Sequence, residues 1–300
     1  MKKTLLLVFA ASMMVACNCS GDHPQKELEG PKDPDPVQTD PQPDPEPDPA
    51  QEPTEADPVT YRIGTYNVGV FSKSGTNTTE MVAAMMKEIG VQVLSMNELD
   101  YFNGRHNVNQ IGAFASAMGG WYSLFAPALT NYQSGQYGVG VAAHPDLKVL
   151  RQATLKLAKG DGSEQRALAV VEFEPFVFAS THLDHKSAAA QLDQAKTITE
   201  WMAANYGSTA KPVFLCGDFN ALPTSATIQY MRENWTVISP EQPTYNAKSP
   251  SKCIDYIMVY KNAVKKVEVL EAQIPTAFKS GDVTIASDHL PVYVDVKLAK

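Results

Sequence analysis

From residue 59 to the C-terminus, the chain alternates between short apolar runs and longer segments whose apolar residues recur every three or four positions. Short apolar or alternating runs indicate β-strands, and the three- to four-residue spacing indicates amphipathic helices. The runs predict strands at 59–68, 91–96, 121–126, 137–143, 148–157, 167–173, 176–180, 213–216, 254–259, 264–270 and 292–296. The longer spacing predicts helices at 79–89, 108–118, 187–206 and 225–233. Consecutive strands with interspersed helices indicate a layered, mixed α/β sandwich.

The first 17 residues have a different pattern. Lys2 and Lys3 precede a short apolar run that ends in Ala16-Cys17, which is typical of a signal peptide and too short for a membrane span. A small residue directly before a cysteine resembles the bacterial lipoprotein cleavage site, where the cysteine is lipidated and becomes the mature N-terminus. An ordinary secreted protein is the alternative. In both cases we expect an extracytoplasmic protein, attached to a bacterial membrane only through a lipid anchor if it is a lipoprotein.

Residues 18–58 form a segment of strongly biased composition. Ten prolines lie between positions 31 and 58, interleaved with Asp, Glu and Gln. Such a segment cannot bury apolar surface and favours extended polyproline II structure. We therefore predict an acidic, proline-rich linker at 18–58, followed by one domain at 59–300.

The distribution of charge bears on the choice of partner. The chain carries a formal charge of −8, but residues 18–58 alone hold 12 acids against two lysines. Residues 59–300 are neutral, with 21 acids and 21 bases. Non-specific nucleic-acid binding depends on a positive field. The neutral domain therefore argues against a general DNA-degrading enzyme, although neutrality overall does not exclude a local basic patch.

Polar side chains follow the apolar strands at six places along the chain. A lone Asp or Asn at such a place is usually a cap or turn residue, but six of them in one domain suggest a shared site. The set is rich in oxygen donors and includes imidazoles, which suits a magnesium-type centre better than zinc. The residues are Asn67, Glu98, His182, His185, Asp218, Asn220, Asp255, Asp288 and His289.

The motifs around these residues are TYN (65–67), NELD (97–100), THLDH (181–185), GDFN (217–220), IDYI (254–257) and SDH (287–289). In this order they resemble the endonuclease/exonuclease/phosphatase superfamily, over roughly residues 60–298, and most closely a bacterial extracytoplasmic branch with the THLDH form. The resemblance implies the DNase I-like fold, a four-layer αββα sandwich of two packed mixed β-sheets. It also implies Mg²⁺- or Mn²⁺-dependent cleavage of a phosphate ester.

The resemblance further implies roles for individual residues. Glu98 would bind the metal, with Asn67 and Asp288 completing or supporting its ligands. His289 would be the catalytic histidine, oriented by Asp255, because a carboxylate on one ring nitrogen raises the basicity of the other. The remaining catalytic candidates have two possible roles each: Asp218 and Asn220 would hold the nucleophile or a phosphate oxygen, and His182 would donate a hydrogen bond to phosphate or protonate the leaving group.

Three residues are candidates for substrate binding. Arg166 begins a strand where many relatives carry a phosphate-facing arginine, and His185 would line the pocket or cap the following helix. Gln136 stands where relatives usually have a glutamate that orients the histidine matching His182. An amide oxygen still accepts a hydrogen bond but brings no negative charge, which puts a general-acid role of His182 in doubt.

Three hypotheses for the function follow. The first is an extracytoplasmic metal-dependent phosphoesterase that hydrolyses a mono- or diester of modest size, such as a lipid headgroup or sugar phosphate, and the neutral domain favours it. The second is a secreted or surface nuclease, which would need clustered Lys and Arg around the site. The third is a non-catalytic binding lipoprotein, which the presence of Glu98, Asp218 and His289 disfavours. We expect a monomer.

Overall fold

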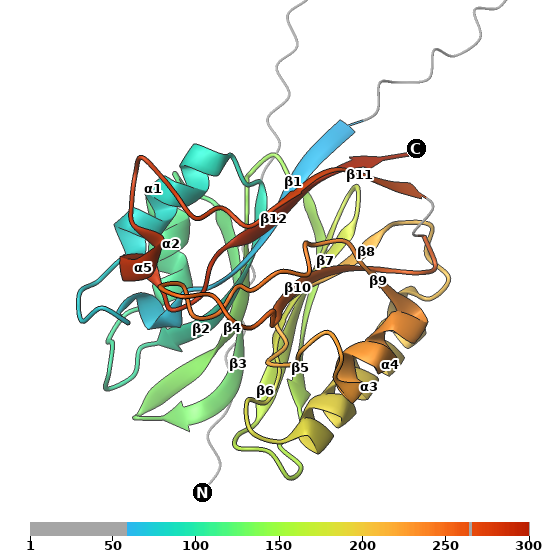
Figure 1. Ribbon diagram of the computed structural model, residues 1–300, viewed down its shortest axis with the longest axis horizontal. Coiled ribbons are helices and arrows are strands. Elements are labelled where there is room, and N and C mark those ends of the chain that lie inside the picture. Colours follow the sequence, from blue (N-terminus) through green and yellow to red (C-terminus); the bar gives the residue numbers. More distant parts are fainter. Residues whose placement is uncertain (1–58, 264–265, 300) are drawn as a thin grey trace, which may run out of the picture. The chain divides into compact units, whose positions relative to one another are not determined.

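Two six-stranded β-sheets pack face to face in the computed structural model, which describes residues 59–263 and 266–299 (Figure 1). The predicted signal peptide at 1–17 and linker at 18–58 lie outside the described residues. None of the described helices is both long and apolar enough to cross a membrane.

The first sheet has the strand order β11-β12-β1-β2-β4-β3. Its strands are β1 (Val59–Asn67), β2 (Val93–Tyr101), β3 (Tyr122–Tyr132), β4 (Gly135–Ala143), β11 (Val267–Gln273) and β12 (Val292–Leu298). Only β1 and β2 run parallel, and Asn67 at the end of β1 pairs in register with Asn97. A parallel pair needs a long crossover connection, which α1 (Thr79–Ile89) supplies here.

The second sheet has the order β5-β6-β7-β8-β10-β9. Its strands are β5 (Val149–Leu157), β6 (Arg166–Phe173), β7 (Val177–His182), β8 (Val213–Asp218), β9 (Trp235–Val237) and β10 (Asp255–Tyr260). Again one pair is parallel: β7 and β8 are joined through α3 (Ala188–Tyr206), and His182 pairs in register with Asp218. The parallel pair of each sheet thus ends in polar residues.

Apolar side chains fill the space between the sheets and the space outside each of them. The central core includes Val141 and Val294 of the first sheet and Phe178 and Phe214 of the second. On the outer faces, α1, α2 (Gln110–Ala117) and α5 (Val283–Ala286) cover the first sheet, and α3 and α4 (Ala226–Asn234) cover the second (Figure 1). The predicted four-layer αββα sandwich is therefore confirmed.

The elements differ from the prediction mainly at their ends. Strands β7 and β8 continue to His182 and Asp218, so these polar residues close the strands instead of following them. Strand β2 runs past the predicted end at residue 96, because a β-bulge between Met96 and Leu99 lets the polar stretch stay in the sheet. The sequence did not predict the short strand β9, helix α5 or the 3₁₀ turn η1 (Gly69–Phe71).

The two cysteines of the described residues lie in the apolar interior. Cys216 and Cys253, whose pairing the sequence left open, are both buried free thiols. Burial raises the pKa of each thiol, to about 11 for Cys253. Both therefore act as small packing groups.

Candidate active site

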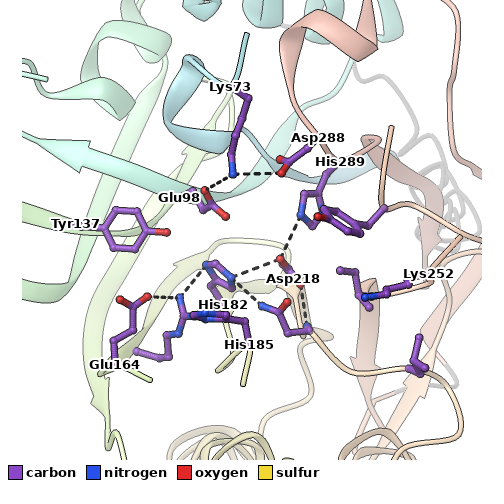
Figure 2. Close-up of a pocket in the computed structure, with 15 residues that line it drawn as sticks. Lys73, Glu98, Tyr137, Glu164, His182, His185, Asp218, Lys252, Asp288 and His289 are labelled. Atoms are coloured by element: carbon purple, nitrogen blue, oxygen red, sulfur yellow. Dashed lines mark hydrogen bonds and ion pairs between the residues drawn. The ribbon is translucent and has the colours of Figure 1, made fainter. Parts of the chain in front are cut away.

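A cleft of about 580 Å³ opens where the polar ends of the two parallel strand pairs meet (Figure 2). Because Asn67 and Glu98 come from one sheet and His182 and Asp218 from the other, the cleft depends on how the sheets pack. Its lining residues are Lys73, Glu98, Tyr137, Glu164, Arg166, His182, His185, Asp218, Asn220, Leu222, Tyr245, Lys252, Ile254, Asp288 and His289. Most of the predicted site residues are in this set; Asn67, Asp255 and Gln136 are not.

Asp255 and His289 form a buried pair behind the cleft. His289 Nδ1 lies 2.9 Å from Asp255 Oδ2, and Thr244 donates to the same oxygen at 2.5 Å. Burial alone would lower the pKa of His289, but the carboxylates of Asp255 and Asp218 outweigh it and raise the pKa to about 10. The ring is therefore an imidazolium at neutral pH, with Nε2 directed toward Asp218 at 3.6 Å.

Asp218 is the central carboxylate of the cleft. Its Oδ1 accepts from the backbone N–H of Asn220 at 2.8 Å, and its Oδ2 accepts from Asn67 Nδ2 at 3.1 Å. Burial raises the pKa of Asp218 to about 7, against the opposing effect of the His289 charge. A carboxylate with such a pKa is a proton acceptor matched to neutral pH.

His182 faces Asp218 from the neighbouring strand. Its Nδ1 lies 3.2 Å from the Arg166 guanidinium, which can only donate. Nε2 lies 3.4 Å from Asp218 Oδ2, an acceptor, and 3.0 Å from Asn220 Nδ2, a donor, so these contacts do not assign the ring proton to one nitrogen. Burial, with the Arg166 charge as the next cause, lowers the pKa of His182 well below its usual value. A neutral ring is a weak acid, which disfavours protonation of the leaving group by His182.

Asn67 is fully buried and donates from its side-chain amide to two carboxylates that line the cleft. Its Oδ1 accepts from the backbone N–H of Gly69 at 3.0 Å, and because that group can only donate, the orientation of the amide is fixed. Nδ2 then donates to Glu98 Oε1 and Asp218 Oδ2, both at 3.1 Å. In the structure Asn67 therefore orients two carboxylates, and its binding of a metal stays a prediction.

Glu98 and Asp288 approach each other around a positive charge. The Lys73 ammonium lies 3.3 Å from Glu98 Oε2 and 3.2 Å from Asp288 Oδ2 (Figure 2). Glu98 sits in the bulge of β2 with φ +56°, a left-handed conformation that is strained for a residue other than glycine. Strain of this kind persists where the surrounding structure requires a side chain to point in one direction.

These two carboxylates fit a divalent cation. Carboxylate oxygens are the ligands that Mg²⁺ and Mn²⁺ prefer, and the cleft already holds a cationic group between them. A second group, Asp218, Asp255 and His289, has one possible ligand atom from each residue within 4.8 Å of the others. There the facing atoms of Asp255 and His289 are already hydrogen-bonded to each other, so Glu98 and Asp288 are the better match.

Arg166 anchors the opposite wall of the cleft. Its guanidinium contacts Glu164 at 3.0 Å and His185 Nδ1 at 2.9 Å, in addition to His182. The residue is only 2 % exposed, and its Nε has no hydrogen-bond partner among the described residues. Arg166 and His185 thus lie together in the cleft, where an anion would face a fixed positive group.

Comparison with known proteins now identifies the family. The sequence profile of the endonuclease/exonuclease/phosphatase family matches residues 64–289. The chain belongs to this family. In general terms, the family indicates a hydrolase that acts on phosphate esters. No curated protein sequence matches the chain significantly.

Several solved structures share the family fold. An endonuclease/exonuclease/phosphatase from Bacteroides vulgatus is 19% identical, with a TM-score of 0.67 over 80% of this chain and 100% of that chain. A mannosyl-6-phosphatase from Bacteroides thetaiotaomicron is 18% identical, with a TM-score of 0.65 over 79% and 99% of the two chains. The human Nocturnin catalytic domain is 16% identical, with a TM-score of 0.61 over 83% and 100%. At these identities the likeness shows the fold.

Gln136 departs from the role that the family resemblance implied. It pairs with Tyr101 across the sheet, and its carbonyl accepts from Asn103 at 3.0 Å. Within the described residues, the ring of His182 contacts Arg166, Asn220 and Asp218, and Gln136 neither lines the cleft nor orients that ring. Side chains alternate along a strand, and the next residue, Tyr137, is the one that reaches the cleft.

Sequence reasoning missed several cleft residues. Lys73 lies in a loop after β1, and Glu164 lies just before β6; each pairs with a residue of opposite charge only in the folded chain. Tyr245 packs its ring 5.0 Å from that of His289, and Lys252 lies 5.8 Å from the Tyr245 ring. The only signal for Glu164 was its position two residues before Arg166, and no sequence motif marked Lys73.

Proposed function

We propose that this protein is an extracytoplasmic, divalent-cation-dependent hydrolase that cleaves a phosphate ester of modest size by attack of water. The observation that carries the proposal is the position of Asp218. Its carboxylate, with a pKa raised to about 7, lies in one cleft with two imidazoles and with the Glu98–Asp288 pair.

The side chains divide the work of hydrolysis among them. Asp218 accepts the proton of the attacking water. The Asn67 amide and the Asn220 backbone N–H hold the Asp218 carboxylate in place. The His289 imidazolium, fixed by Asp255, and the neutral His182 ring face the charge that develops on the phosphate oxygens. Glu98 and Asp288 would hold the cation, which supplies further neutralisation of phosphate charge.

The charge balance of the cleft supports a small substrate. Two lysines and one arginine line it, and two of these three side chains are paired with acids of the same cleft: Lys73 with Glu98 and Asp288, and Arg166 with Glu164. Among the described residues this leaves little free positive charge for a polyanion. A mannosyl-6-phosphatase among the structural neighbours makes a sugar phosphate the first substrate class to test, with lipid headgroups second.

The location outside the cytoplasm rests on the sequence. A basic, apolar leader ending in Ala16-Cys17 and the acidic spacer at 18–58 are typical of an exported lipoprotein whose domain stands away from its membrane.

A substrate panel tests the function. Purified protein is assayed with Mg²⁺ or Mn²⁺ on sugar phosphates, phospholipid headgroup esters and single- and double-stranded oligonucleotides, with and without chelator. We expect hydrolysis of one of the small esters, measured as released phosphate for a monoester or as released alcohol for a diester, and loss of activity with chelator. Preferred cleavage of oligonucleotides with a steep dependence on salt would support a nuclease instead, and no hydrolysis of any ester would reject the proposal.

A further inference from the structure

Lys73 is a cleft residue for which neither the family motifs nor the mechanism above gives a role. Its ammonium lies between Glu98 and Asp288, at 3.3 and 3.2 Å from their oxygens (Figure 2). The lysine side chain is 37% exposed, against 19% and 29% for the two carboxylates. A cation of the chain itself thus stands at the place that the proposed function assigns to a divalent cation.

The backbone before Lys73 is held in an unusual shape. Gly69, Val70 and Phe71 have φ values of +52°, +51° and +52°, so three successive residues adopt the left-handed conformation. This conformation is unfavourable for Val and Phe. Asn67 offsets the cost by accepting from the Gly69 N–H at 3.0 Å, and Gln110 does so by donating to the Val70 carbonyl at 2.6 Å.

The side chain of Lys73 follows a path that a glycine leaves free. A Cβ atom at Gly69 would lie 2.3 Å from Lys73 Cγ and 2.6 Å from its Cε. The lysine stem therefore runs directly across Gly69 before the ammonium reaches the carboxylates. The same Asn67 that fixes this turn also donates to Glu98, so the turn, the lysine and the carboxylate are positioned together.

We infer that Lys73 competes with the divalent cation for Glu98 and Asp288. In the cation-free protein the ammonium neutralises the two carboxylates, and a cation binds them by displacing it. The two positive groups cannot share the position, because the like charges would lie within contact distance of each other. This inference rests on the proposed function, since that function assigns these carboxylates to the cation.

The competition predicts a direct effect on cation affinity. Without the Lys73 ammonium, a cation binds without first breaking two ion pairs. Breaking two partly exposed ion pairs corresponds to about a fivefold to tenfold change in affinity. We expect Lys73→Met to bind Mn²⁺ more tightly than the wild-type protein by about this factor. The measurement is isothermal titration of the protein with Mn²⁺ in the absence of substrate, with paramagnetic resonance of free Mn²⁺ as a second readout.

Lys252→Met is the matched control. Lys252 lines the same cleft, but within the described residues it makes no ion pair with Glu98 or Asp288, which contact Lys73. Removing it takes one positive charge from the cleft without freeing the carboxylates. Equal tightening in both variants would show a general charge effect and overturn the inference, as would unchanged or weaker Mn²⁺ binding in Lys73→Met.

A second variant guards against misfolding. Lys73→Gln keeps a polar side chain, one atom shorter, and removes the charge, and we expect its Mn²⁺ affinity to rise like that of Lys73→Met. The rise in Tm on adding Mn²⁺ should also be larger in both variants than in the wild-type protein. These titrations use no ester, so failure of the substrate panel and failure of the competition are separate results. Absence of Mn²⁺ binding in the wild-type and both variants would reject the competition.

Discussion

The Nδ1 atom of His289 lies 2.9 Å from Oδ2 of Asp255. His289 precedes β12 of the first sheet, and Asp255 begins β10 of the second, so this contact joins the two sheets directly behind the cleft. It also explains the charge of the imidazole, because the Asp255 carboxylate is the main group that raises the His289 pKa against the effect of burial.

Removing the charge of Asp255 tests this pair. In Asp255→Asn the amide keeps the size of the side chain but no longer stabilises the imidazolium, so the pKa of His289 falls toward its ordinary value. Turnover should decrease on the order of 10²- to 10⁴-fold, as for other carboxylate–histidine pairs. Steady-state kinetics and an NMR titration of the histidines measure both effects. Unchanged turnover with a lowered His289 pKa would exclude a catalytic imidazolium.

Asp218 predicts the pH dependence of the reaction. A base works in its deprotonated form, and burial raises the pKa of Asp218 to about 7. The value of kcat/KM should therefore rise with pH along an acidic limb centred at or below that pKa, since a bound cation can only lower the pKa of a neighbouring carboxyl. In Asp218→Asn we expect this limb to disappear with most of the activity. If the acidic limb of the kcat/KM profile lies at the same pH in Asp218→Asn, the limb belongs to another group.

The strained backbone at Glu98 predicts a conflict between stability and activity. With φ at +56°, this position favours glycine over any residue with a Cβ. Glu98→Gly should therefore have a higher free energy of unfolding than Glu98→Ala, by about 1 kcal/mol, while both variants lose turnover and Mn²⁺ affinity. Chemical denaturation compares the two. Equal stability of Gly and Ala at this position would show that the bulge imposes no strain.

Asp184 of the THLDH motif is predicted to stabilise the fold. Its carboxylate accepts from the backbone N–H groups of Ser163, Lys186 and Ser187 at 2.6, 2.8 and 2.9 Å. Burial would raise the pKa of Asp184, but the hydrogen bond from the Ser163 hydroxyl at 2.7 Å, together with the backbone hydrogen bonds, outweighs it and holds the pKa well below its usual range. Since the folded pKa is depressed, the stabilisation is complete above the unfolded value of about 3.9 and is lost as the pH falls through the folded pKa.

The variant Asp184→Asn should accordingly lower the free energy of unfolding at neutral pH by about 2 kcal/mol, and its stability should depend less on pH below about 4. Asp193→Asn is the control, because Asp193 is an exposed acid on α3, 3.9 Å from Lys196. Denaturation curves at several pH values measure both variants. A similar loss of unfolding free energy in Asp193→Asn would show that the effect is not specific to Asp184.

Cys17 predicts the location of the protein. If the leader ends at a lipoprotein cleavage site, the wild-type protein expressed in a bacterial host fractionates with membranes and incorporates labelled fatty acid. Cys17→Ala should lose both the label and the membrane association, while Cys19→Ala keeps them. Export of an unlabelled, soluble wild-type protein would favour an ordinary secreted protein.

The sequence predicted the architecture and most of the cleft for a physical reason. Parallel strands that end in polar residues place them at one edge of a sheet, as the registers of Asn67 with Asn97 and His182 with Asp218 show. The pairing of Asp255 with His289 came instead from the family resemblance, and the structure places the two side chains within hydrogen-bond distance. Local sequence patterns are sufficient to predict the place of a side chain where neighbouring residues along the strand determine its position.

The sequence was less informative where the decisive contact is long-range. The direction of the Asn67 amide depends on the Gly69 backbone in a left-handed turn that no motif marks. The bulge that keeps Glu98 inside β2 resembled the end of a strand, because a polar run usually terminates one. Lys73 meets Glu98 across 25 residues of sequence and Asp288 across most of the domain, so its pairing required the folded chain.

The division of the cleft between the two sheets has a consequence for biogenesis. Neither sheet alone carries both the Glu98 side chain and Asp218. A chain still extended in a translocon would therefore be unable to hydrolyse a substrate, even with each motif intact. If the protein is exported as proposed, activity would begin only after the two sheets have packed together beyond the membrane, and phosphate esters inside the producing cell would not be cleaved.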